Sequence, residues 1–102
     1  MTSPIRTTIS NVHPVTIADV AVPNGSSVAI VAATPANPAF YGVTIKALAA
    51  NTNKVRAGDA LISATRGIEL SAGDSITFPE SDPSKLFVWG VGAGSSVCVS
   101  WV

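Results

Sequence analysis

The chain has few of the side chains that most catalytic and metal sites need. Its 102 residues include one histidine, His13, and one cysteine, Cys98. A single cysteine excludes an internal disulfide, and one histidine with one cysteine supplies too few ligands for a zinc site. A Ser-His-Asp triad would have to use His13, yet no nucleophile-elbow pattern is present. We therefore expect no enzymatic activity, no cofactor and no metal.

Charge is equally scarce. Only 12% of the residues are charged, and six basic residues balance six acidic ones. A net charge of zero provides no general attraction to nucleic acid or to an anionic membrane, so neither is expected as a partner. With 12 serines and 9 threonines the surface is expected to be neutral and rich in hydroxyl groups. Little self-repulsion keeps copies of such a chain apart, which favours a homo-oligomer or an assembly component.

Long apolar runs are also missing. The longest one, residues 28–33, is far too short to span a bilayer. The first ten residues lack the charged and apolar blocks of a signal peptide, so synthesis in the cytoplasm without secretion is expected. Hydrophobic residues nevertheless make up 47% of the chain, which excludes a disordered protein.

Helix breakers occur throughout the chain, with seven prolines and eight glycines. The one helical candidate is residues 44–54, which contain leucine and several alanines. Against a helix, Val43, Ile45 and Ala47 alternate with Thr44 and Lys46. Because β-branched residues lead this segment and its period is two, we predict a strand there.

Short segments of alternating hydrophobicity recur between turn signals. They predict strands from Val15, near Val28 and Ile30, at 40–48, near Val55, near Ile62, at 68–70, at 75–78, and in a final hairpin of residues 85–91 and 95–102. This spacing is typical of an all-β protein, a small antiparallel β-sandwich or barrel of about eight strands, similar in size to a jelly roll or an immunoglobulin domain. We predict a single β domain at 15–102. Residues 1–14 are either an arm that orders on a neighbouring subunit or a frayed end.

Ala-Gly-Asp occurs twice, at residues 57–59 and 72–74. Calcium-binding Gly-Asp repeats need a nine-residue period and many carboxylates in register, and this chain has neither. We therefore interpret these segments as structural turns in which glycine permits a positive φ. The glycines expected to serve turns are Gly25, Gly58, Gly67, Gly73, Gly92 and Gly94. Gly67 is expected at the tip of a hairpin from Ile62 to Leu70.

Aromatic and basic side chains offer possible binding surfaces. Four cations, Lys46, Lys54, Arg56 and Arg66, lie near Phe40 and Tyr41 in the sequence. They form either a solvated sheet face or a single-strand nucleic-acid platform. Trp89 and Trp101 belong to the core or a subunit contact, or else stack on sugars. The candidate interface residues are Ile5, Arg6, Trp89 and Trp101. Cys98, within an alternating segment, is expected to be a buried and unreactive thiol.

Residues 42–90 carry a distinctive order of turns and strands. It consists of Ile45-Lys46-Ala47, Asn51-Thr52, Gly58, Ser63-Ala64-Thr65-Arg66-Gly67, Leu70-Ser71-Ala72-Gly73-Asp74-Ser75 and Asp82-Pro83-Ser84-Lys85. This order resembles small structural proteins of tailed-bacteriophage virions. The resemblance covers about half of the chain and implies a β-rich, non-enzymatic virion component made in the host cytoplasm.

Three functions remain open from the sequence. The first is a capsid decoration or cement protein that binds the major capsid protein on the surface of the virion. The second is an adhesin domain of a tail, baseplate or fibre that binds a host glycan. The third is a small barrel that binds single-stranded nucleic acid.

Overall fold

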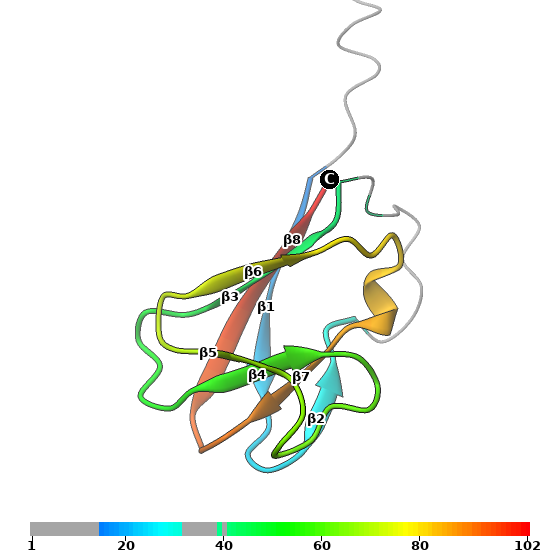
Figure 1. The fold of residues 1–102 in the computed structure, drawn as a ribbon. Coiled ribbons are helices and arrows are strands. Elements are labelled where there is room, and N and C mark those ends of the chain that lie inside the picture. Colours follow the sequence, from blue (N-terminus) through cyan, green and yellow to red (C-terminus); the bar gives the residue numbers. More distant parts are fainter. Residues whose placement is uncertain (1–14, 32–38, 40) are drawn as a thin grey trace, which may run out of the picture.

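The computed structural model describes residues 15–31, 39 and 41–102. These residues form two antiparallel sheets of four strands each, packed face to face (Figure 1). The strands are β1 (Thr16–Val22), β2 (Ser27–Ala29), β3 (Val43–Ala47), β4 (Val55–Gly58), β5 (Ile68–Leu70), β6 (Ser75–Phe78), β7 (Phe87–Gly90) and β8 (Ser95–Trp101); a single 3-10 turn, η1 (Pro83–Lys85), precedes β7. The predicted all-β class and the sandwich are confirmed. A closed barrel is not formed, because each sheet ends in two edge strands.

The strands follow a nested pairing. The first sheet has the order β1-β8-β3-β6, and the second has the order β2-β7-β4-β5. Within these sheets β1 pairs with β8, β2 with β7, β3 with β6 and β4 with β5. The chain is therefore one long antiparallel hairpin rolled up so that successive strands of each half alternate between the sheets. This arrangement is the jelly roll, in which two Greek keys form two packed sheets.

The period-two alternation of the strands builds the core. In β8, Val97, Val99 and Trp101 point inward and are buried, while Cys98 and Ser100 lie on the outer face. The inward residues of both sheets form one cluster, made up of Val22, Ile30, Ala39, Val43, Ile45, Ala47, Val55, Ala57, Leu70, Leu86, Val88, Val97, Val99 and Trp101. Burial of this cluster removes apolar surface from water and holds the two sheets together.

Two expectations for the middle of the chain are settled by the sheets. The segment considered as a helix, residues 44–54, is the strand β3 followed by a turn, so the strand interpretation is confirmed. The strand expected near Ile62 is wrong. Ile62 lies in the β4–β5 loop, where its amide donates to the Asp59 carbonyl oxygen at 3.0 Å and its side chain is buried. The Ile62 side chain is therefore buried although its backbone lies in a loop. The hairpin is formed by β4 and β5 instead.

The turn glycines behave in two ways. Gly25, Gly67, Gly73 and Gly94 have positive φ angles, and so does Gly42, which was not among those expected. Gly58 and Gly92 do not: the expectation of a positive φ at Gly58 is wrong, because this residue is the last of β4 and pairs with Phe87. At Gly92 the requirement for glycine is space, since a Cβ there would collide with the Asn53 side chain.

Candidate functional site

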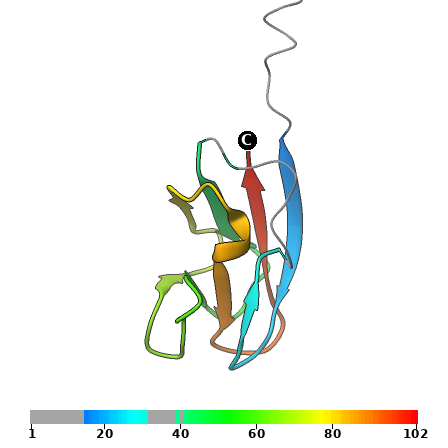
Figure 2. The same ribbon diagram turned by 90° about the vertical axis from the view of Figure 1, so that its right-hand side faces the viewer.

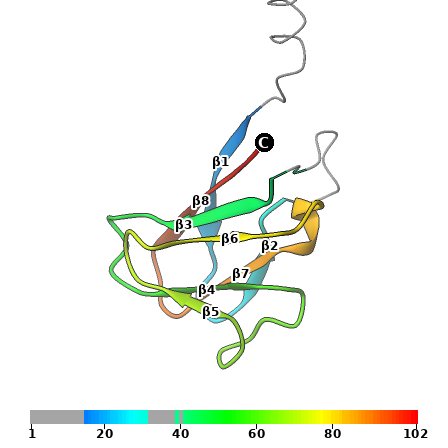
Figure 3. The same cartoon turned by 45° about the horizontal axis from the view of Figure 1, so that its top comes forward.

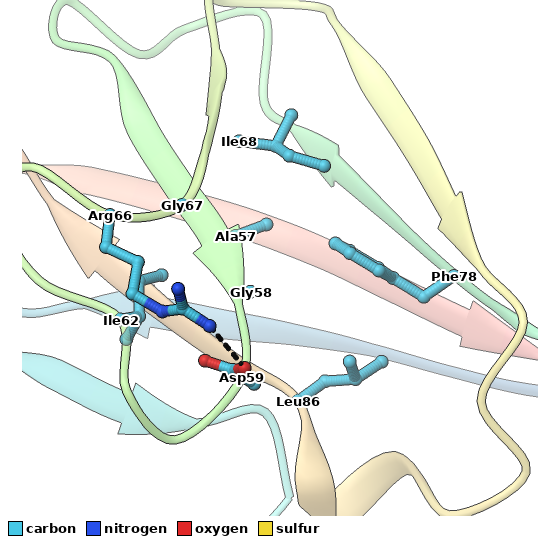
Figure 4. Close-up of a pocket in the computed structure, with 9 residues that line it drawn as sticks. All are labelled: Ala57, Gly58, Asp59, Ile62, Arg66, Gly67, Ile68, Phe78 and Leu86. Atoms are coloured by element: carbon cyan, nitrogen blue, oxygen red, sulfur yellow. Dashed lines mark hydrogen bonds and ion pairs between the residues drawn. The ribbon is translucent and has the colours of Figure 1, made fainter.

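The described residues contain a groove of about 380 Å³ between the two sheets, at the edge formed by β5 and β6. Its lining is mainly apolar and comes from both sheets and the β4–β5 loop (Figure 4). The apolar side chains that line it are Ala57, Ile62, Ile68, Phe78 and Leu86. A groove of this volume, lined by apolar groups with few polar ones, is the usual form of a binding site.

The groove exists because inward-facing residues are left without a cover. Ile68 pairs with Ala57 and Phe78 pairs with Val43, and both of these partners are fully buried core residues. Residues on paired positions share a face, so Ile68 and Phe78 face the interior. Yet Ile68 is 45% exposed and Phe78 is only half-buried. At this edge the two sheets are therefore too far apart for their inward-facing apolar side chains to cover one another fully.

The separation follows from the connection between the two edge strands. β5 and β6 belong to different sheets and diverge from the turn at residues 71–74. That turn is held on β3, because the Gly73 amide donates to the Ala47 carbonyl oxygen and the Ala47 amide donates to that of Asp74, both at 2.9 Å. Leu70, next to the turn, is buried, whereas Ile68 and Phe78 lie at the far ends of their strands and line the groove.

The mouth of the groove is formed by the β4–β5 loop, which projects from the sandwich (Figure 3). Arg66 Nη2 donates to Asp59 Oδ2 at 3.0 Å, and the Leu61 amide donates to Asp59 Oδ1 at 3.0 Å. The hydrogen bond from Arg66 and that from the Leu61 amide hold the pKa of Asp59 below its usual value. The buried Ile62 side chain anchors the same loop. The mouth is thus organised by local contacts within one loop.

The four basic residues of the proposed nucleic-acid platform do not gather on one face. Lys46 lies on the outer face of the first sheet, while Arg56 belongs to β4 of the second. Arg56 and Lys54 both pair with Glu69, at 3.0 and 3.1 Å. Arg66 pairs with Asp59. A cationic stripe that follows a nucleic-acid backbone is therefore not assembled by these side chains.

The two tryptophans occupy different environments. Trp101 is 4% exposed and belongs to the core, so its ring cannot stack on an external sugar. Trp89 has buried neighbours in the chain, Val88 and Gly90, and so points to the outer face of the second sheet. There it is half-buried and lies across from Arg56 and Ser27 in the strand register. Of the two described candidate interface residues, Trp89 and Trp101, Trp89 is the one whose side chain is partly exposed on the outer face of a sheet. The other two candidates, Ile5 and Arg6, lie outside the described residues, as does His13.

Cys98 is not in the core as expected. It lies half-buried on the outer face of the first sheet, next to Asp19 on β1. Partial burial, followed by the negative charge of Asp19 and a hydrogen bond to it, raises the pKa of the Cys98 thiol. The thiolate is the reactive form, so this environment keeps Cys98 in its unreactive state.

The part of the chain that the structure describes contains neither a metal cluster nor a membrane-spanning helix. No cluster of three or more histidine, cysteine or carboxylate side chains is arranged there to hold a metal ion. Within the same residues, no helix has the length and apolarity needed to cross a bilayer. No protein-family model, curated protein or solved structure matches this chain. The groove is therefore the candidate site that the described geometry supports best.

Proposed function

We propose that this chain is a non-enzymatic structural protein of a tailed-bacteriophage virion that decorates the assembled capsid and stabilises it. In this role the groove at the β5–β6 edge receives an apolar side chain of the major capsid protein. The observation that carries the proposal is the partly uncovered apolar interior at this edge, where the inward-facing Ile68 is 45% exposed and Phe78, which packs against the core, is only half-buried. When another protein fills the groove, these apolar side chains are removed from water, and this burial stabilises the complex.

Two further features support the virion role. The jelly-roll topology is an arrangement found in viral capsid domains. The turn motifs that resemble phage structural proteins include Arg66 and Gly67, which line the groove, and the turn that joins β5 to β6. Because one fold hosts many functions, the topology supports the proposal only together with the groove.

The energetics favour several weak contacts over one strong contact. Complete burial of one apolar side chain contributes about 1.5–3 kcal/mol, whereas micromolar affinity needs about 8 kcal/mol. One groove is therefore too weak by itself. Several copies that bind a lattice together gain affinity from their effective concentration. Binding only to the assembled shell then stabilises that shell by mass action.

The proposal is tested with capsids that lack this protein. Purified protein is added, and its occupancy and the temperature of heat-induced genome release are measured. Saturable binding with a raised release temperature is expected, and it should change little with salt because the contact is apolar. Ile68→Asp should weaken binding about tenfold or more, equivalent to about 1.4 kcal/mol. Val91→Asp is the matched control, because Val91 is 51% exposed and lies outside the groove.

Two results would count against this role. Absence of binding to heads, with binding to tails or cells instead, would reject capsid decoration. Equal binding by the Ile68 and Val91 variants would place the contact elsewhere on the protein.

A second function is favoured by Trp89. This half-buried indole on the outer face of the second sheet lies across from Arg56, whose Nη2 is paired with Glu69. An aromatic ring beside hydrogen-bonding groups on a flat sheet suits the apolar and polar faces of a sugar, and jelly rolls include lectin domains. The adhesin function predicts glycan-array binding that Trp89→Ala abolishes and Ile68→Asp leaves unchanged.

A further inference from the structure

The edge strand β1 differs from the three other edge strands of the described sandwich. β2 and β5 have three residues each and β6 has four; a proline directly follows both β6 and β1, at Pro79 and Pro23. β1 has seven residues, lies along the margin of the molecule (Figure 2) and contains neither lysine nor proline; its one charge is Asp19. Edge strands are normally shortened, charged or blocked by proline because their free backbone groups recruit other strands. β1 has little of this protection.

The side of β1 that carries free backbone groups can be deduced from its neighbours. The Leu48 amide donates to the Ser96 carbonyl oxygen at 3.2 Å, which continues the β3–β8 ladder. The even-numbered residues of β8 therefore bond toward β3, and the odd-numbered ones bond toward β1. Their β1 partners are Thr16, Ala18, Val20 and Val22. Consequently Ile17, Asp19 and Ala21 direct their N–H and C=O groups to the free edge.

Apolar side chains lie beside this edge. Ile17 is 67% exposed, and Val15 and Tyr41 are exposed as well. The three line one shallow hollow of about 250 Å³ on the outer face of the first sheet, which extends across β8 so that Tyr41 lies on the β3 side, away from the free edge. Val15 and Ile17 belong to the chain of β1 itself, so a strand added to the edge would cover them at the same time.

We propose that the free edge of β1 pairs antiparallel with β1 of a second copy and joins the two first sheets into one continuous eight-stranded sheet. A strand that pairs with itself forms a closed twofold interface without any further partner. Pairing centred on Ile17 places Ile17 against its counterpart and Asp19 against Val15 of the other copy. Pairing centred on Asp19 is disfavoured because it would set two carboxylates directly opposite each other.

The expected affinity is modest. Pairing centred on Ile17 aligns residues 15–19 of the two copies, an overlap about 17 Å long, and an edge of a two-layer sandwich about 20 Å deep then offers on the order of 350 Å² per copy. Stable interfaces usually bury about 800 Å² per partner. We therefore expect a dimer whose population depends on concentration in the micromolar range.

The dimer leaves the groove accessible. β1 and β6 are at opposite ends of the first sheet, and the groove lies at the β6 edge. Each dimer therefore presents two grooves, one per copy. The inference does not rest on the proposed function, because dimerisation is measured without capsids.

The test is analytical ultracentrifugation of the full chain over a range from micromolar to hundreds of micromolar. Ile17→Lys puts a charge at the centre of the interface, and Asp19→Pro removes an amide that points to the free edge opposite Val15 of the other copy, while leaving the bonds to β8 intact. Leu61→Lys is the matched control, because Leu61 is 71% exposed on the β4–β5 loop, away from β1. Circular dichroism checks that each variant is folded.

We expect the wild type and Leu61→Lys to dimerise alike, and Ile17→Lys to weaken dimerisation about tenfold or more. Asp19→Pro should weaken it as well; if that variant is unfolded, the comparison of Ile17→Lys with Leu61→Lys decides alone. A wild type that is monomeric over the whole range would overturn the inference. So would a dimer that Ile17→Lys does not weaken, or that Leu61→Lys weakens equally.

Discussion

The side-chain amide of Asn51 pairs with both backbone polar groups of Ser96. Its Nδ2 donates to the Ser96 carbonyl oxygen at 2.8 Å, and the Ser96 amide donates to its Oδ1 at 3.0 Å. Asn51 lies in the turn after β3, and Ser96 lies near the start of β8. The amide thus extends the β3–β8 ladder beyond the end of β3 and helps to hold two strands that are far apart in the sequence.

Asn51→Ala should lower the free energy of unfolding by about 1–3 kcal/mol, because it leaves the half-buried Ser96 amide without its acceptor. Asn51→Asp keeps the acceptor for the Ser96 amide but sets a carboxylate oxygen against the Ser96 carbonyl oxygen, so it should not restore the wild-type stability. The comparison is Asn53→Ala, which removes one exposed bond to the Ala93 carbonyl oxygen. Urea denaturation measures all three variants, and equal losses for Asn51→Ala and Asn53→Ala would contradict the bridging role.

Gly67 and Gly73 test the difference between backbone strain and steric collision. Both have positive φ, but a Cβ on Gly67 would lie 3.0 Å from Ile62 Cγ1 and 3.1 Å from Arg56 Cβ, whereas a Cβ on Gly73 meets nothing within 4 Å. Strain alone costs about 1–3 kcal/mol. Gly67→Ala should therefore destabilise the protein more than Gly73→Ala. Gly58→Ala, with no positive φ and ordinary contacts at 3.7 Å, should be nearly neutral in the same thermal melts.

The tryptophans should differ in their contribution to stability. Trp101→Ala removes a ring buried in the core and should cost about 3–5 kcal/mol. Trp89→Ala removes a half-buried ring from the outer face of a sheet and should cost clearly less. Denaturant unfolding of the two variants provides the comparison. A similar loss for both would mean that Trp89 has a structural role equal to that of Trp101.

The pH response of Asp59 follows from its ion pair. Its folded-state pKa lies below the ordinary value of 3.8, since Arg66 and the Leu61 amide hydrogen-bond the carboxylate. The stabilisation is therefore fully present above the unfolded-state pKa and is lost as the pH falls through the folded-state pKa. NMR titration should give an Asp59 midpoint below 3.8, and Arg66→Gln should raise it. An unchanged midpoint in that variant would reject the ion pair as the main cause.

Cys98 should react slowly with thiol reagents near neutral pH. Its pKa lies above the ordinary value of 9.0, because partial burial and Asp19 both disfavour the thiolate. Asp19→Asn removes the charge, so it should lower the pKa and speed the reaction, though burial keeps part of the shift. The rate of modification as a function of pH gives the thiol pKa directly. Ser96→Ala, two residues from Cys98 on the same face and paired with Ala21 instead of Asp19, serves as the control.

The class of fold was accessible from the sequence because short-range patterns specify it. Val97, Val99 and Trp101 alternate with polar or small residues, and strands with one buried face require this alternation. Ile62 shows the limit of the same reasoning. An apolar residue between turns signals burial, but the side chain can be buried from a loop as well as from a strand.

The groove could not be predicted in the same way. Ile68 and Phe78 carry the same inward-facing signal as any core residue, and nothing in the local pattern distinguishes a covered position from an uncovered one. Likewise the charges of Lys46, Arg56 and Arg66 are close in sequence, yet the roll of the chain sends them to different sheets or pairs them with carboxylates. Cys98 is a different case, because the alternation along β8 that turns Val97 and Val99 inward also places Cys98 on the outer face; only its neighbour Asp19 was decided by the register with β1.

Alternation and turn chemistry act over a few residues, so the strands, their inward faces and most of the positive-φ glycines are properties of local sequence. The nested pairing runs from β1 with β8 to β4 with β5. Its outermost pair joins residues from the two ends of the domain, such as Thr16 and Trp101. Which edges stay open therefore depends on how the whole chain rolls up. The groove at β5 and β6 and the free edge of β1 both arise at that level, where burial of one common core decides which apolar groups remain in contact with water.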